Sequence, residues 1–135
     1  MSTVLPVKTP DFLDALHSRV LIGDGAMGTQ LQGFDLDVET DFLGLEGCNE
    51  ILNDTRPDVV AQIHRAYFTA GADLVETNTF GCNLPNLADY NIADRCQELA
   101  YKGTRIARTV ADELGPGRDG MRRFVLGSMG PGTKL

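Results

Sequence analysis

The amino-acid sequence predicts an α/β fold built on a parallel β-sheet. Three short strand-like runs, at 20–22, 73–77 and 123–126, alternate with helical stretches, and each run ends in glycines or small polar residues. Alternation of this kind gives parallel strands joined by right-handed crossovers. Because ligands collect at the carboxyl ends of parallel strands, we expect the three polar loops to form one ligand site.

Two architectures fit this order of elements, a doubly wound sheet and part of a (β/α)8 barrel. A complete barrel needs about 250 residues. This chain has 135 residues and about three strands, so it would form an incomplete barrel. No linker or low-complexity tract divides the chain, which indicates one domain over 1–135.

The first third of the chain should contain little regular structure. We expect a loose lead-in at 1–9, a short helix at 12–18 and a buried strand at 20–22. Residues 31–52 lack a sustained hydrophobic period and are expected to form a long loop with room for one short helix. The apolar side of the first helix should lie under the first strand and consists of Phe12, Leu13 and Leu16.

A firm helix is predicted after residue 55. Thr55 should be its N-cap, Pro57 lies in its first turn and Gly71 should end it. Its side chains at helical spacing are Val59, Val60, Ile63, Tyr67 and Ala70.

A second firm helix should run from an N-cap at Asn91 to a stop at Gly115 and Pro116. Its apolar stripe consists of Cys96, Leu99, Ala100, Gly103, Ile106, Ala107, Val110 and Leu114. The polar turn at 117–120 then leads into the third strand.

Charge and composition exclude several classes of partner. The net charge is −7, from 12 Lys and Arg against 19 Asp and Glu, which argues against nucleic acid or an anionic membrane surface. No apolar run approaches the ~18 residues of a membrane-spanning helix. Three cysteines at wide spacings, with no CxxC pair, make a disulfide framework unexpected and favour a reducing cytoplasm.

The glycine loop at 23–28 has the spacing of a dinucleotide-binding fingerprint, but its chemistry disagrees. Asp24 lies where a pyrophosphate would bind, and its charge would repel that group. The residues suit an amino acid better, since Asp24 can accept hydrogen bonds from an ammonium group and the N–H groups of Gly25 and Ala26 suit a carboxylate. A simpler alternative stays open, in which Asp24 only caps its own turn.

A set of motifs in a fixed order resembles the homocysteine S-methyltransferase family, from about 20 to 131. Among them the segment 47–50, Gly-Cys-Asn-Glu, favours the amino-terminal, homocysteine-binding module of the cobalamin-dependent methionine synthases over the betaine-dependent members. The motifs are 24–29, 47–50, 56–57, 63–68, 70–73 and 76–81.

The resemblance implies a fold and a reaction. The family folds as a (β/α)8 barrel, and 1–135 would be the amino-terminal part of that domain. Homocysteine binds at the carboxyl face, where zinc holds its thiolate, and the methyl group passes from methyltetrahydrofolate through methylcobalamin on neighbouring modules. By motif, Asp24 should bind the homocysteine amino group and the Gly25 and Ala26 amides its carboxylate, while Thr77, Asn78 and Thr79 should line the same mouth.

The chain departs from the family pattern at the metal. The zinc ligands of the family are one cysteine and an adjacent pair on later strands, and no Cys-Cys pair occurs here. We therefore expect no catalytic residue, no metal ligand and no bound zinc or cobalamin in this chain, which should be inactive alone. Cys48 and Cys96 are interpreted as structural and Cys82 as a bystander.

Two further interpretations concern individual side chains. His64 is expected to be a half-exposed surface residue, whereas Tyr67, Phe68 and Phe80 are expected in the core.

A rival to the enzyme-fragment interpretation is a stand-alone amino-acid-binding or interaction module. In either case the sheet should have two open edges, which favour self-association.

Overall fold

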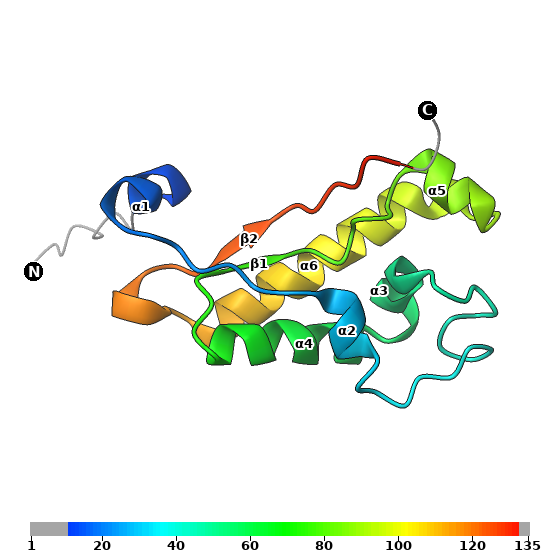
Figure 1. The fold of residues 1–135 in the computed structure, drawn as a ribbon, viewed down its shortest axis with the longest axis horizontal. Helices are drawn as coiled ribbons and strands as arrows, with labels where there is room; N and C mark the ends of the chain where they lie inside the picture. The colour runs from blue at the N-terminus through cyan, green and yellow to red at the C-terminus, as the bar shows by residue number, and fades with distance from the viewer. Residues whose placement is uncertain (1–10, 133–135) are drawn as a thin grey trace, which may run out of the picture.

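The computed structural model describes residues 11–132, so the lead-in expected at 1–9 lies outside the described residues. Helices make up most of the regular structure, and the two long ones pack along one side of a small parallel sheet (Figure 1). In chain order the elements are α1 (Phe12–Ser18), α2 (Met27–Leu31), the 3-10 turn η1 (Asn49–Ile51), α3 (Leu52–Thr55), α4 (Pro57–Thr69), β1 (Leu74–Glu76), α5 (Leu84–Asp89), η2 (Ala93–Arg95), α6 (Cys96–Leu114), η3 (Arg118–Gly120) and β2 (Phe124–Leu126). Across the described range, no helix has the length and apolar character needed to span a bilayer.

The two strands pair in parallel, which confirms the predicted relation between 73–77 and 123–126. Leu74 pairs with Phe124 and Glu76 with Leu126, so the carboxyl ends of the two strands lie side by side. The segment before the glycine loop lies along the other side of β1. It forms one parallel bridge, between Gly23 and Leu74, and the Ile22 carbonyl accepts from the Asp73 N–H at 2.7 Å.

The prediction of a buried strand at 20–22 is wrong for this structure. Val20 is 84% exposed and Ile22 is 49% exposed, and the segment is extended without forming a full ladder. The physical reason is that it lies at an edge, because β1 covers one side of it and no described element covers the other.

Helices α4 and α6 lie next to each other along the same side of the strands (Figure 1). Their contact with the sheet forms a core cluster in which Phe68 meets Val75 and three residues of α6, namely Ala107, Val110 and Ala111. The predicted stripe of α6 is confirmed at its centre, since Leu99 and Gly103 are buried as well. In α4 the stripe is confirmed for Val59, Val60 and Ile63, while Ala70 is exposed.

Both predicted N-caps are wrong. Thr55 ends α3, and its hydroxyl donates to the Asp41 carbonyl at 2.5 Å, so α4 begins at Pro57 without a side-chain cap. Asn91 has a positive φ of 59° and lies between α5 and η2. A left-handed residue suits a turn rather than an N-cap, which requires extended backbone.

Helices α2 and α5 have five and six residues and were not expected from the sequence. Elements this short span fewer than two turns and therefore give no hydrophobic period to detect. The N-cap of α5 is Asn83, whose side chain accepts from the Asn86 N–H at 2.9 Å.

Three side-chain expectations are corrected by burial. Leu13 and Leu16 are largely exposed, because α1 instead packs with Ala15 buried and Phe12 edge-on against Phe124, with ring centroids 5.4 Å apart. His64 is fully buried, since it follows Val60 by one helical turn on the covered face of α4. Phe80 is 61% exposed rather than in the core, whereas Phe68 is buried as expected and Tyr67 partly so.

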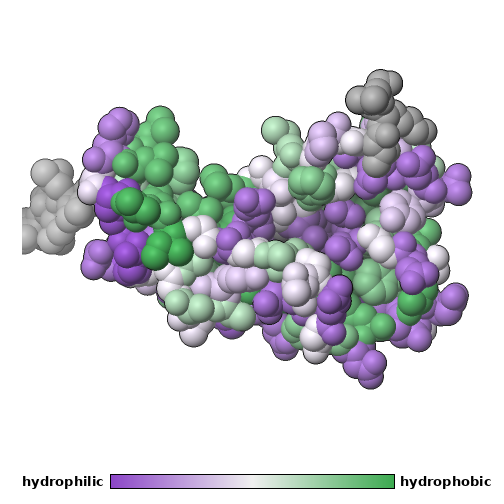
Figure 2. Space-filling view, viewed as in Figure 1, coloured by the Kyte–Doolittle hydropathy of each residue, from purple (hydrophilic) through white to green (hydrophobic). Residues whose placement is uncertain are grey.

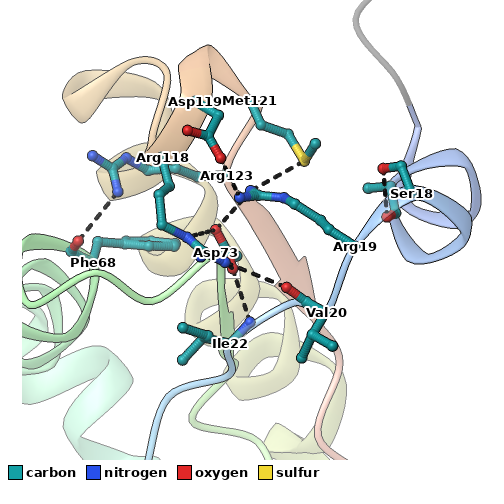
Figure 3. A network of polar contacts seen from close by, with 11 residues as sticks. Ser18, Arg19, Val20, Ile22, Phe68, Asp73, Arg118, Asp119, Met121 and Arg123 are labelled. Carbon is teal, nitrogen blue, oxygen red and sulfur yellow. Dashed lines mark hydrogen bonds and ion pairs between the residues drawn. The ribbon is translucent and has the colours of Figure 1, made fainter.

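A polar network fastens the amino ends of the strands, opposite the predicted site. Figure 3 shows the Asp73 carboxylate between the guanidinium groups of Arg19 and Arg118. Asp73 also accepts from the Ile22 N–H at 2.8 Å, and its side chain is 3% exposed. Burial would raise the pKa of Asp73, but the hydrogen bonds from Arg118 and Ile22 and the two positive charges together hold it below its usual range.

Candidate functional site

A cleft of about 430 Å³ opens at the carboxyl ends of the strands. Its wall consists of the glycine loop 24–28, the residues 49–50 before α3, the last residue of β1 with the two that follow it (76–78), and Phe80 and Ser128. The loops after all three strand-like runs therefore meet at one place.

Most of the sequence-predicted site residues line this cleft. Asp24, Gly25 and Ala26 lie on one wall, with Thr77 and Asn78 also in contact with the cavity. Thr79 is buried behind the wall and is not among the lining residues. The structure therefore brings five of the six residues to one surface and places the sixth in their support.

Asp24 links the glycine loop to the sheet. Its Oδ2 accepts from the Glu76 backbone N–H at 3.1 Å, so the carboxylate binds across to β1 in addition to any role in its own turn. Burial, together with the nearby charge of Glu76, raises the pKa of Asp24 to about 6, while the Glu76 N–H acts in the opposite direction. Near neutral pH the group is ionised, but it keeps a strong demand for a positively charged partner.

The hydroxyl groups of Thr77 and Thr79 stiffen the loop after β1. Their oxygens lie 2.6 Å apart, and the Thr79 hydroxyl donates to the Ser128 carbonyl at 2.8 Å. The Ser128 N–H in turn donates to the Thr77 hydroxyl oxygen at 3.1 Å. These bonds tie the loops after β1 and β2 together, which explains why Thr79 supports the cleft without lining it.

Sequence reasoning missed two carboxylates of the cleft. Glu76 is the last residue of β1, and its Oε2 accepts from the Ser128 hydroxyl at 3.1 Å. Glu50 is buried, and its Oε1 accepts from the Gly81 N–H at 2.8 Å. The signals were present, because Glu76 directly precedes the predicted residues 77–79 and Glu50 belongs to the motif 47–50.

The electrostatic character of the cleft is therefore negative. It contains the carboxyl groups of Asp24, Glu50 and Glu76, and no Lys or Arg is among its lining residues within 11–132. Backbone N–H groups of the glycine loop are the positive counterpart at the same wall. This arrangement suits a small zwitterion, whose cation binds the carboxylates and whose anion binds the amides.

The described residues do not fit a zinc site. Cys48, Cys82 and Cys96 are free thiols that pack in one apolar cluster, and none lines the cleft. Burial raises the pKa of Cys82 to about 12, which disfavours the thiolate that a metal requires. From residue 11 to residue 132, no three His, Cys, Asp or Glu side chains are grouped so that they could hold a metal ion.

The family model for homocysteine S-methyltransferase matches residues 21–135. The chain therefore belongs to the homocysteine S-methyltransferase family, which confirms the resemblance seen in its motifs. A methionine synthase of Mycobacterium tuberculosis is 71% identical over 126 residues, and one of Mycobacterium leprae is 66% identical over 125 residues. Each alignment covers 93% of this chain but 10% of the relative, so the chain spans about a tenth of the length of those proteins.

Solved structures share the fold. The homocysteine methyltransferase MmuM from Escherichia coli matches in its oxidized and metallated forms, each with a TM-score of 0.68 and 21% sequence identity. The matches cover 85% and 87% of this chain and 39% and 40% of the other. The described α/β fold therefore corresponds to less than half of that larger chain.

Proposed function

We propose that this chain is the amino-terminal part of the homocysteine-binding domain of a methionine synthase. The parent enzyme would transfer a methyl group from methyltetrahydrofolate, through methylcobalamin, to homocysteine to give methionine. Identity to methionine synthases supports the choice of reaction. The observation that carries the binding role is the half-buried Asp24 carboxylate beside the open glycine loop of the cleft.

The proposed pose follows from charge. The ammonium group of homocysteine would donate to Asp24, and its carboxylate would accept from the N–H groups of Gly25 and Ala26. Asn78 would contact the substrate at the same mouth, and Thr77 and Thr79 would hold that mouth in shape. The homocysteine thiol would then point away from the sheet, toward parts of the enzyme that lie outside this chain.

The remainder of the parent protein would supply what this chain lacks. We infer that later strands close the sheet into a (β/α)8 barrel and cover the exposed edge at 20–22. Zinc would be held by cysteines on those strands, and cobalamin and methyltetrahydrofolate by further modules. This chain alone would be inactive, and the parent enzyme would act in the cytoplasm.

A second function is favoured by one observation, namely that the cleft is formed while no metal-ligand group lies in the described residues. In that case the 135-residue chain would act alone as an amino-acid-binding or interaction module. An immunoblot of source cells distinguishes the two functions by the size of the polypeptide. The enzyme-fragment proposal predicts a polypeptide several-fold larger than 14.6 kDa, and the stand-alone module predicts one of about this mass.

Calorimetric titration of the full-length parent protein with homocysteine tests the proposed function. Asp24→Asn should weaken binding about tenfold or more, since a charge-assisted hydrogen bond is worth roughly 1.5–3 kcal/mol. Asp35→Asn removes the same charge from an exposed position outside the cleft and should leave the affinity unchanged. Equal affinity in Asp24→Asn and the unaltered protein, or no binding by the latter, would overturn the proposal.

A further inference from the structure

A buried asparagine outside the cleft wall is bonded to one that lines it. Asn53, on α3, is 2% exposed and uses its whole amide group. Its Nδ2 donates to the carbonyl oxygens of Asn78, at 2.8 Å, and Leu99, at 3.1 Å. Its Oδ1 accepts from Nδ2 of Asn78 at 3.0 Å.

These bonds fix which way each amide faces. Carbonyl oxygens only accept hydrogen bonds, so the two carbonyls force Asn53 to present its Nδ2 to them. Its Oδ1 then faces Asn78, which must present Nδ2 in return. The Asn49 carbonyl accepts from Nδ2 of Asn78 at 2.9 Å, which requires the same orientation of the Asn78 amide.

The consequence concerns the remaining polar atom of Asn78. Both hydrogens of its Nδ2 are directed to protein acceptors, one to Asn53 and one to Asn49. Within residues 11–132 its Oδ1 makes no hydrogen bond, and the residue lines the cleft that contains Asp24. The network therefore leaves a fixed acceptor, and not a donor, free at the mouth.

Gly103, on α6, makes room for this network. A Cβ atom at this position would lie 2.6 Å from Nδ2 of Asn53 and 2.9 Å from Cγ2 of Thr79. Glycine in the middle of a helix costs about 1 kcal/mol relative to alanine. The close approach of Asn53 and the loop after β1 gives a physical reason for a glycine at that position.

We propose that Asn53 and Gly103 are positioning residues, which orient the Asn78 amide so that its Oδ1 accepts a hydrogen bond from the substrate ammonium group. This inference rests on the proposed function, because it assumes homocysteine in the cleft. Asp24 supplies the charge for the ammonium group, and Asn78 supplies a neutral acceptor of fixed direction.

The test compares homocysteine with 4-mercaptobutanoate, the same molecule without its ammonium group, in the full-length parent protein. Calorimetry or competition would give both affinities for Asn53→Ala, Gly103→Ala and the direct variant Asn78→Ala. Each variant should lose about tenfold in affinity for homocysteine and keep its affinity for the analogue. Thr104→Ala, at an exposed position next to Gly103, should change neither affinity.

The outcomes separate this inference from the proposed function. An equal loss for both ligands, or no loss for either, overturns the positioning role while homocysteine binding by the unaltered protein leaves the function intact. No homocysteine binding by the unaltered protein overturns both. If Gly103→Ala does not fold, Asn53→Ala and Asn78→Ala carry the same comparison, because they only remove atoms.

Discussion

Asp24 gives the cleft its expected pH dependence. Its pKa is raised to about 6 by burial, and only the ionised form can accept hydrogen bonds from an ammonium group at both oxygens. We expect protonation of Asp24 to reduce the affinity for homocysteine below pH 6, by about tenfold per pH unit at the limit. Titrations of the parent protein across this range check the slope, and a flat profile down to pH 5 would contradict it.

The same residue should reduce the stability of the fold. The pKa of Asp24 is higher in the folded state than its usual 3.8, so ionising this carboxyl group is harder in the folded chain. The stability that the protonated group contributes is therefore fully present below pH 3.8 and is lost as the pH rises through 6. An asparagine at this position would not ionise, and its side-chain oxygen could still accept from the Glu76 N–H. Asp24→Asn should therefore stabilise the protein at pH 7.5, by about 1 kcal/mol at most because the group is half exposed. Denaturant unfolding measures this, and a loss of stability would be the contrary result.

His64 should make the fold sensitive to acid. Both ring nitrogens are buried, and neither has a hydrogen-bond partner in the described part of the chain. Burial lowers the pKa of His64 from 6.5 to about 4. The associated stability is thus present above pH 6.5 and is lost as the pH falls toward 4, by roughly 3 kcal/mol in total.

Unfolding curves of His64→Leu at pH 7.5 and pH 5 check this expectation. The variant should be at least as stable as the original chain at pH 7.5 and should show a smaller loss at pH 5. His17→Leu provides the matched control, because it makes the same exchange at a histidine that is exposed on α1. A pH 5 loss that is unchanged in His64→Leu would exclude His64 as the cause.

Single residues differed in how far the sequence could predict them. Asp24 and Asn78 could be found because a carboxylate or amide at the end of a strand is costly to bury without a function. The burial of His64 and the exposure of Phe80 could not, since both depend on which side of an element meets its neighbour. The position of Asn53 behind the cleft depends on contacts between α3, α6 and the loop after β1.

Among the elements, long periodic helices were predicted best. The 19 residues of α6 gave a clear stripe, and its stop at Gly115 corresponds to a φ of 69°. Short elements such as α2 and α5 gave no period. The exposed segment 20–22 has the composition of a buried strand, but burial requires a neighbour on each side. Within the described residues, β1 is the neighbour on one side, and the other side is open.

The network around Asp73 should hold this segment to β1. Asp73→Asn would weaken two ion pairs and leave Arg19, whose side chain is 18% exposed, paired with the exposed carboxylate of Asp119. We expect a loss of about 2–3 kcal/mol in unfolding free energy, below the roughly 3–5 kcal/mol for a fully buried ion pair because Arg118 is partly exposed. Asp112→Asn breaks an exposed pair on α6 and should cost less than about 1 kcal/mol. Equal effects of the two substitutions in denaturant unfolding would contradict this role.

At the level of the whole molecule, one end carries an uncovered apolar surface. Figure 2 shows hydrophobic residues gathered over α1 and the adjoining segment, and the exposed side chains there are Leu13, Leu16, Val20 and Ile22. The edge at 20–22 lies in the same region. Exposed apolar patches and unpaired strand edges both favour association.

We therefore expect the isolated 135-residue chain to self-associate as its concentration rises. Sedimentation velocity should detect the larger species, and the double variant Leu16→Lys with Ile22→Lys should shift the population toward monomer. The exposed residue Leu84, on α5 at the other end of the molecule, supplies the control substitution Leu84→Lys. A chain that stays monomeric at all concentrations and melts reversibly in one sharp transition would contradict the expectation.

The most direct test of the binding proposal is a crystal structure of the full-length parent protein with homocysteine bound. We expect the homocysteine nitrogen within hydrogen-bond distance of the Asp24 carboxylate and of Asn78 Oδ1, and its carboxylate on the N–H groups of Gly25 and Ala26. Homocysteine bound elsewhere, or bound with its carboxylate facing Asp24, would contradict the role assigned to this cleft.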